Sequence, residues 1–206
     1  MGGITDSGRV VAKRVFTPVA RLLLRVGISP DAVTVVGTLG VAAAALAFFP
    51  RGQFLVGTLV ISLFVFSDSL DGTMARLSGR PSQWGAFLDS TLDRVADAAI
   101  FMGVALWFAG DGDDLLLTGV TVAALVGGLM VSYARARAES LGAAASIGVA
   151  ERTERLAMIL LATLVFGITD QRGILAIGVW AVAVLSWVTV GQRIWTVRGQ
   201  LLNRGS

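Results

Sequence analysis

Four aspartates lie at helical spacing inside otherwise apolar segments. Asp68 and Asp71 are three residues apart in one segment, and Asp89 and Asp93 are four apart in the next. Side chains at these spacings share one helix face. If the stretch between the segments is a short turn, the helices are antiparallel neighbours. Both pairs then lie roughly 10–17 Å from the turn, at about 1.5 Å of rise per residue. The four carboxylates can therefore converge.

If the apolar segments span a membrane, the negative charge of a cluster of acids inside them must be balanced. Each acid costs about 2.5–3.5 kcal/mol on insertion scales, and four together repel one another unless cations balance them. Arg76 and Arg94 are too few to do so. The chain contains no histidine and no cysteine, so carboxylate oxygens favour Mg²⁺, Mn²⁺ or Ca²⁺ over zinc. Two divalent cations would balance the four charges, and two-metal sites are typical of phosphoryl chemistry.

Two other interpretations of the acids are open at this stage. The carboxylates could line a cation-transport pathway, although they cluster towards one face instead of tracing a path across the bilayer. They could also have a purely structural role, with one acid pairing with arginine or bonding a helix end. That interpretation gives no account of a whole quartet.

The elements that must position these acids are membrane helices. Of the residues, 55% are hydrophobic and 15% charged, with a mean hydropathy of +0.77. Long apolar stretches without strand alternation predict an all-α integral membrane protein. Ser29 and Pro30 resemble an N-cap followed by proline in the first turn. Six transmembrane helices are predicted at 31–49, 54–77, 83–108, 114–138, 154–170 and 173–195.

A basic amphipathic segment precedes these spans. Residues 6–27 place valines and leucines on one side and Lys13, Arg14, Arg21 and Arg25 on the other, which predicts an interfacial helix. We expect one domain over 1–206: a juxtamembrane helix in 1–28, a six-helix bundle in 31–195 and a cytosolic tail in 196–206.

Charge asymmetry predicts the orientation. With a cytosolic amino terminus, only Arg51 and Arg172 of the 17 basic residues face outward. Both termini and the acidic cluster are then cytosolic, as expected for a multi-pass protein of the cell (plasma) membrane. Because the basic residues sit at helix ends, the net charge of +3 does not indicate a nucleic-acid partner.

The acidic segments contain a longer pattern: D-x-x-D-G-x-x-A-R, eight residues, then G-x-x-x-D-x-x-x-D. Its fixed positions are Asp68, Asp71, Gly72, Ala75, Arg76, Gly85, Asp89 and Asp93. This pattern resembles the CDP-alcohol phosphotransferase family, as do the six-span layout and the amphipathic amino-terminal helix.

The resemblance implies an enzyme that uses CDP-diacylglycerol as donor, with two divalent cations, Mg²⁺ or Mn²⁺, on the pyrophosphate. Asp68, Asp71 and Asp89 would bind metal, and Asp93 would be the general base while also contacting a metal. Family members are commonly homodimers within the membrane lipid. The implied contacts to the CDP-lipid are Asp31, Ala32, Val33, Thr34, Asp68, Gly72, Ala75, Arg76, Ser82 and Gly85.

The acceptor is indicated by a second basic group at the cytosolic helix ends. This group comprises Ser132, Arg135, Arg137, Arg152, Arg155 and Arg193. Membrane topology alone could explain these arginines; the functional alternative is a site for an acceptor that carries phosphate. The stretches 132–139 and 151–155 resemble the phosphatidylinositol phosphate synthases of actinobacteria, although those commonly have proline at the position of Thr153. We therefore expect inositol phosphate as the acceptor, with glycerol 3-phosphate as the first alternative.

Overall fold

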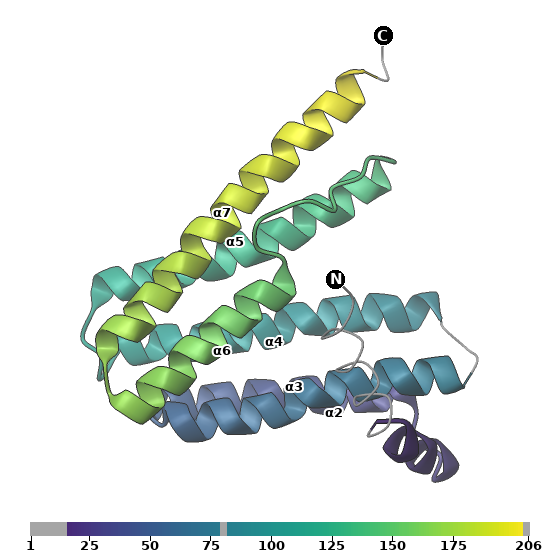
Figure 1. Ribbon diagram of the computed structural model, residues 1–206, viewed down its shortest axis with the longest axis horizontal. Helices are drawn as coiled ribbons and strands as arrows, with labels where there is room; N and C mark the ends of the chain where they lie inside the picture. Colours follow the sequence, from purple (N-terminus) through teal and green to yellow (C-terminus); the bar gives the residue numbers. More distant parts are fainter. Residues whose placement is uncertain (1–15, 79–81, 204–206) are drawn as a thin grey trace, which may run out of the picture. The chain divides into compact units, whose positions relative to one another are not determined.

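The computed structural model describes residues 16–78 and 82–203, except the side chains of 66–69 and 71. Every regular element in that part of the chain is helical (Figure 1). After a helical segment at 16–25, the elements are α2 Pro30–Phe48, the 3₁₀ helix η1 Phe49–Arg51, α3 Phe54–Leu77, α4 Gln83–Ala109, α5 Leu115–Ser140, α6 Arg152–Thr169 and α7 Arg172–Leu202.

The prediction of an all-α fold is confirmed, and each predicted span coincides with one helix. The bounds agree within two residues except at the end of α7, which continues to Leu202 instead of ending at 195. Tertiary contacts accompany the extra turns, because side chains beyond 195 contact the α5–α6 connection.

Within residues 16–78 and 82–203, three helical segments are long and apolar enough to cross a membrane: Pro30–Arg51, Leu115–Ser140 and Arg172–Leu202. Helix α3 adds a shorter apolar stretch, Phe54–Val65. The count of six spans stays a prediction. The interfacial helix also stays a prediction, because residues 6–15 of the predicted segment lie outside the described part.

Local hydrogen bonds explain where two of the helices begin. Ser29 Oγ accepts a hydrogen bond from the Ala32 amide at 3.1 Å, which confirms the predicted cap before Pro30. Asp114 Oδ1 accepts one from the Leu117 amide at 2.9 Å and so caps α5. These bonds satisfy amide groups that have no partner within their own helix.

The chain falls into two compact units, one of residues 1–43 and 60–96 and the other of 44–59 and 97–206. Within the first unit, α2 and α3 pack so closely that a Cβ on Gly40 would overlap the Phe64 ring. All four aspartates of the family pattern belong to this unit. The prediction of a single domain is untested and stays a prediction.

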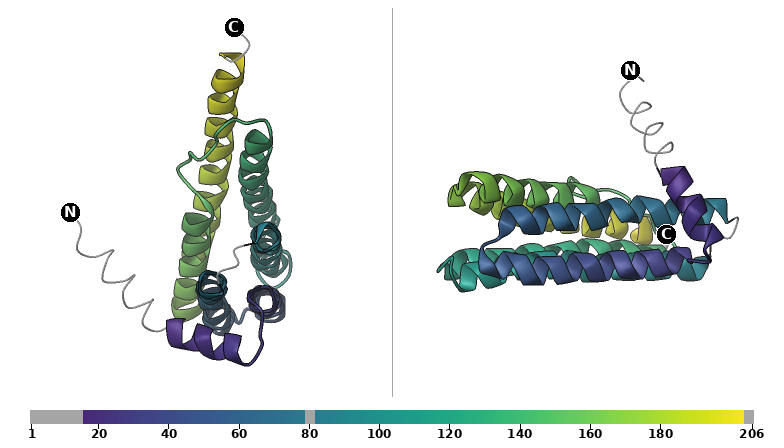
Figure 2. Two further views of the ribbon diagram at one scale, coloured as in Figure 1. Left: turned by 90° about the vertical axis from the view of Figure 1, so that its right-hand side faces the viewer. Right: turned by 90° about the horizontal axis from the view of Figure 1, so that it is seen from below.

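Within the second unit, α7 packs along α5 and α6 (Figure 2). The Thr58 hydroxyl of α3 donates a hydrogen bond to the Thr163 hydroxyl of α6 at 2.8 Å, and both side chains are buried. A Cβ on Gly167 would overlap the Leu55 backbone. Small residues and hydroxyl groups thus join these helices, as is usual in membrane proteins.

An aromatic cluster lies at one end of the second unit. The Phe54 ring is 5.0 Å from Phe49, 5.1 Å from Trp107 and 4.9 Å from Phe166, measured between ring centroids. The Arg172 guanidinium lies 5.8 Å from the Trp107 ring.

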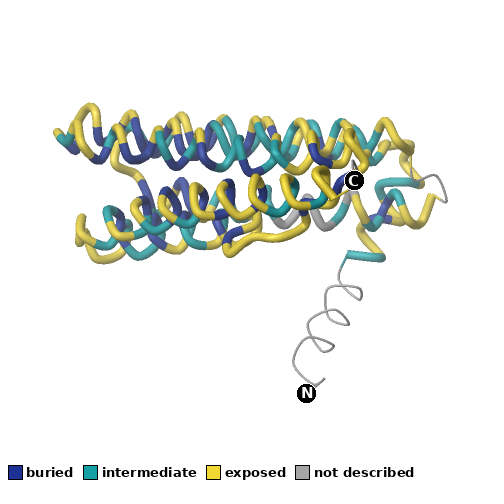
Figure 3. Tube along the Cα trace, turned by 90° about the horizontal axis from the view of Figure 1, so that it is seen from above, coloured by how far each residue is buried: buried dark blue, intermediate teal, exposed yellow. Residues whose placement is uncertain are grey.

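Figure 3 shows that buried and exposed residues alternate along the helices, so each helix has a packed side and an open side.

Candidate functional site

The four aspartates lie on α3 and α4, as predicted. The side chains of Asp68 and Asp71 are outside the described part, so the convergence of all four stays a prediction. Asp89 is exposed, whereas the Asp93 side chain is 15% exposed and its Oδ2 lies 3.3 Å from Arg94 Nη2. Among the described side chains, no three carboxylates lie together as metal ligands.

Three of the predicted nucleotide contacts come together where α2 and α4 begin. Ser82 Oγ accepts a hydrogen bond from the Gly85 amide at 2.8 Å. A Cβ on Gly85 would lie 3.1 Å from Ser82 Oγ and 3.6 Å from Asp31 Oδ1. Any larger residue at 85 would therefore crowd Ser82 Oγ, whereas its distance to Asp31 Oδ1 is that of an ordinary contact. In the same turn of α2, Thr34 Oγ1 donates to the Pro30 carbonyl at 3.2 Å. The Ala32 amide bonds Ser29 Oγ, and the Val33 amide donates to the Ser29 carbonyl at 3.3 Å.

The surface beside Gly72 is open. No described atom lies within 4 Å of a Cβ built on this glycine. Ala75 is half-buried one turn later, and Arg76 is exposed with its Nη2 donating to Thr73 Oγ1 at 3.3 Å. This face of α3 therefore has small side chains next to a cation at a helix end, which suits a bulky anionic ligand.

The predicted acceptor residues on α5 are accessible. Arg135 pairs with Glu139 at 2.9 Å, and both side chains are about half exposed. Arg137 Nη1 lies 3.4 Å from Ser140 Oγ, and Ser132 Oγ donates to the Gly128 carbonyl at 3.2 Å. Exposed pairs of this kind contribute only about 0–1 kcal/mol, so an anionic ligand can displace them.

Arg155 and Arg193 are instead 2% exposed. Arg155 Nη1 donates to the Ala150 carbonyl at 3.1 Å, and its Nη2 lies 3.5 Å from the Gly128 carbonyl. Arg193 donates to the carbonyls of Ile147 at 2.8 Å and Val131 at 2.6 Å. Part of the hydrogen-bonding capacity of both side chains is therefore used to fix backbone.

Two acidic residues near these arginines did not emerge from the sequence analysis. Asp97 Oδ1 accepts from Arg152 Nε at 3.2 Å, and Glu151 Oε1 lies 3.8 Å from Arg193 Nη2. Asp97 continues the four-residue spacing of Asp89 and Asp93 along α4, and that spacing was the signal that could have revealed it. Glu151 has no such signal.

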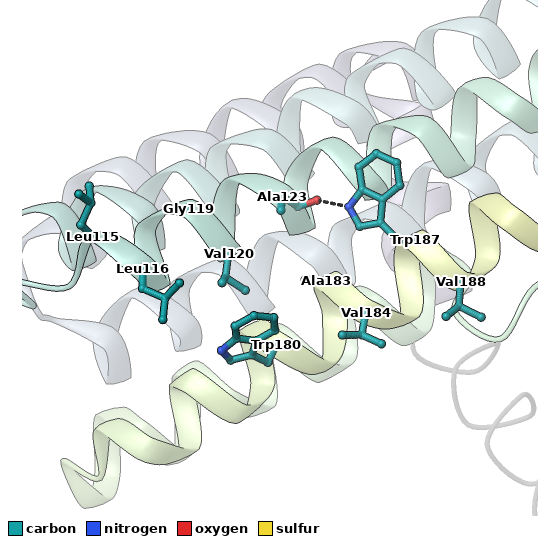
Figure 4. Close-up of a pocket in the computed structure, with 10 residues that line it drawn as sticks. All are labelled: Leu115, Leu116, Gly119, Val120, Ala123, Trp180, Ala183, Val184, Trp187 and Val188. Carbon is teal, nitrogen blue, oxygen red and sulfur yellow. Dashed lines mark hydrogen bonds between the residues drawn. The ribbon is translucent and has the colours of Figure 1, made fainter.

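An open groove of about 670 Å³ runs between α5 and α7 (Figure 4). Its walls include Leu116 and Val120 of α5 and Trp180 of α7. The indole of Trp187 donates to the Ala123 carbonyl at 3.1 Å. No residue lining the groove is charged, and none belongs to a predicted site, so the groove holds no group suited to the chemistry considered above.

Comparison with known proteins identifies similar enzymes. The chain is 54% identical to the phosphatidylinositol phosphate synthase of Streptomyces avermitilis, over 92% of this chain and 80% of the relative. It is 42% identical to the synthase of Mycobacterium tuberculosis H37Rv, over 92% and 88%.

Solved structures of the Mycobacterium tuberculosis synthase are also similar to this chain. The complex with CDP-DAG has a TM-score of 0.87 at 42% identity and covers 89% of this chain and 94% of its own. The complex with manganese and citrate has a TM-score of 0.83 at 41% identity, with 88% of each chain covered. Residues 27–192 match the CDP-alcohol phosphatidyltransferase family. This range includes all eight fixed positions of the aspartate pattern. The chain therefore belongs to the CDP-alcohol phosphatidyltransferase family.

Proposed function

We propose that this protein is a phosphatidylinositol phosphate synthase, which transfers the phosphatidyl group of CDP-diacylglycerol to a hydroxyl of inositol phosphate and releases CMP. The observation that carries this proposal is the complete aspartate pattern on α3 and α4 in a chain 54% identical to such an enzyme. The basic group on α5, α6 and α7 supports an acceptor that itself carries phosphate.

Asp68, Asp71, Asp89 and Asp93 would hold two divalent cations, Mg²⁺ or Mn²⁺. The donor set fits hard cations, because it consists of carboxylates in a chain without histidine or cysteine. A manganese complex of a similar protein supports the choice of metal. When bound, the cations would neutralise charge on the pyrophosphate.

Asp93 would be the general base. Its carboxylate takes the proton of the acceptor hydroxyl, whose oxygen forms a bond to the β-phosphorus while the bond between that phosphorus and the CMP oxygen breaks. The nearby Arg94, 3.3 Å from Oδ2, restricts the orientation of this carboxylate.

The cytidine nucleotide would bind to the first unit. The turn Asp31–Thr34, together with Ser82 and Gly85, would contact the nucleotide. Gly72 and Ala75 would leave room for it, and Arg76 would pair with a phosphate.

The acceptor phosphate would bind to the second unit. The exposed Arg135 and Arg137 are suited to direct contact, together with Ser132. Arg152, Arg155 and Arg193 would add positive charge while also holding the surrounding backbone in place.

The setting we propose is the cell membrane. The protein would span it several times, with both termini and the site cytosolic, and would form a homodimer within the lipid. The three long apolar helices support membrane insertion, and the bias of basic residues supports the orientation.

A panel of acceptors tests the function. Purified protein with CDP-diacylglycerol and Mg²⁺ is supplied separately with inositol phosphate, glycerol 3-phosphate, free inositol or serine, and CMP release is measured. We expect release with inositol phosphate. Release with glycerol 3-phosphate alone would reassign the acceptor, and release with free inositol but not its phosphate would refute the proposed arginine site. Nucleotide-independent cation flux into liposomes, without CMP release, would favour a transporter.

A further inference from the structure

The connection between α5 and α6, residues 141–151, is held by one face of α7. This face consists of Thr189, Arg193, Val197 and Gln200, which are spaced four, four and three residues apart and therefore lie on one side of the helix. Figure 1 shows the connection turning back from the end of α5 towards the start of α6. Its residues meet the α7 face in reverse order, so the two segments run antiparallel.

Gln200 makes the contact farthest along α7. Its Nε2 donates to the Ala144 carbonyl at 2.8 Å, and its Oε1 accepts from the Ala144 amide at 2.8 Å. The side-chain amide thus satisfies both polar groups of one backbone residue, which requires both a donor and an acceptor. One turn earlier, Val197 packs against the buried Ala138, Ala143 and Ala145. We call these contacts of Gln200 and Val197 the α7 clasp.

The middle of the connection depends on polar contacts. Arg193 Nε donates to the Ile147 carbonyl at 2.8 Å, and the Ala150 amide donates to Thr189 Oγ1 at 3.2 Å. Gly148 has a φ of +148°, and a Cβ there would overlap the Thr189 methyl group. Residues 147–149 and α7 also line an open surface groove of about 530 Å³.

The connection leads directly to the proposed acceptor site. The amide of Ala150 bonds α7, and its carbonyl accepts from Arg155 Nη1 at 3.1 Å. Glu151, which precedes α6, lies 3.8 Å from Arg193. A shift of the connection would therefore move the backbone that orients Arg155 and the first turn of α6.

We propose that Gln200 is a positioning residue for acceptor binding, acting through the α7 clasp on the α5–α6 connection. Gln200 contacts neither substrate in this proposal, which rests on the proposed function. The turns of α7 beyond residue 195, interpreted from sequence as the start of a tail, are in this view part of the acceptor-binding machinery.

The test compares Gln200→Met with Gln171→Met in the full-length enzyme. Methionine keeps the length of the side chain but loses both hydrogen bonds. Gln171 is the control because it is exposed and directly precedes the first residue of α7. Steady-state kinetics give kcat and a KM for each substrate, and amide hydrogen exchange follows residues 143–151. Gln200→Met should raise the KM for inositol phosphate about three- to tenfold, with kcat and the KM for CDP-diacylglycerol within about twofold. Exchange in the connection should become faster.

Gln200→Glu refines the test because it keeps an acceptor for the Ala144 amide and loses the donor. Because its second carboxylate oxygen faces the Ala144 carbonyl as a further acceptor, its acceptor KM should rise at least as much as that of Gln200→Met. Faster exchange with an unchanged acceptor KM would overturn the proposal, as would a fall in kcat alone or an equal effect of Gln171→Met. If the wild-type enzyme does not use inositol phosphate, the proposed function itself fails, and this role of Gln200 fails with it. The wild-type measurement alone shows this, so a failure of the proposed function is distinguished from a failure of the Gln200 proposal.

Discussion

At the scale of single residues, Asp89 and Asp93 differ in their surroundings although they share one face of α4. Asp89 is exposed, whereas Asp93 is largely covered and lies next to Arg94. A base must be held in one orientation, and a metal ligand must be able to approach its ion. The covered position of Asp93 fits its proposed role as base, which it combines with a metal contact, and the exposed position of Asp89 fits its proposed role as a metal ligand alone.

Replacing Asp93 tests the proposed base. Asp93→Asn keeps the shape but cannot accept the proton, so CMP release should fall by roughly 10²–10⁴-fold while the protein still inserts and remains folded. Asp111→Asn, in an exposed turn, is the matched control and should retain full activity. Turnover at the wild-type rate in Asp93→Asn would remove this assignment.

Gly72 offers a second test at this scale. An added methyl group meets no described atom within 4 Å, and alanine favours a helix over glycine by about 0.5–1 kcal/mol. Gly72→Ala should therefore keep or raise the melting temperature but increase the KM for CDP-diacylglycerol several-fold, because the methyl occupies space for the nucleotide. Gly173→Ala, also without a near neighbour, should leave the kinetics unchanged. Equal kinetics in both variants would contradict a nucleotide at Gly72.

At the scale of helices, the sequence predicted the elements well because the signals are local. Apolar runs and the Ser29 cap placed five of the six helices within two residues at each end. The end of α7 was predicted too early, because its last turns contact Ala144, which is 56 residues away.

For the candidate site, the sequence predicted the family and the helices that carry the aspartates, and the convergence of their side chains stays a prediction. The spacing of the aspartates is a local signal and gave the family. The sequence did not show which of the arginines are buried. Arg193, for example, is buried where it bonds the carbonyl of Val131, which is 62 residues away. Such contacts depend on packing that no spacing in the sequence encodes.

The hydrogen bond between Thr58 and Thr163 provides a prediction about helix packing. Thr58→Val, Thr163→Val and the double variant form a cycle whose coupling energy should be about 0.6–1.7 kcal/mol, measured from unfolding in detergent. Thr118→Val, whose hydroxyl bonds the carbonyl of Asp114 next to its own helix, should show no coupling to Thr163. Strict additivity of Thr58→Val and Thr163→Val would show that the bond does not join α3 and α6.

At the scale of the whole molecule, the orientation in the membrane decides which substrates reach the site. Nucleotide-activated lipid headgroups and inositol phosphate are supplied from the cytosol in this account. The bias of basic residues predicts a cytosolic site, and the lack of native cysteine makes this directly testable.

Single cysteines should label from opposite sides. In intact cells, a membrane-impermeant maleimide should react with Asp111→Cys, which lies in the α4–α5 turn, and not with Asn203→Cys after α7. Permeabilised cells should label both variants. Labelling of Asn203→Cys alone in intact cells would invert the proposed topology.

The central claim of this account is that the aspartates of α3 and α4 bind divalent cations that engage the diphosphate of the donor lipid. Electron paramagnetic resonance of Mn²⁺ with the purified protein and CDP-diacylglycerol measures this directly. We predict two bound ions per chain, and a loss of bound Mn²⁺ in Asp68→Asn and Asp71→Asn but not in Asp111→Asn. No bound Mn²⁺ in the wild type, or equal binding in all four proteins, would contradict it.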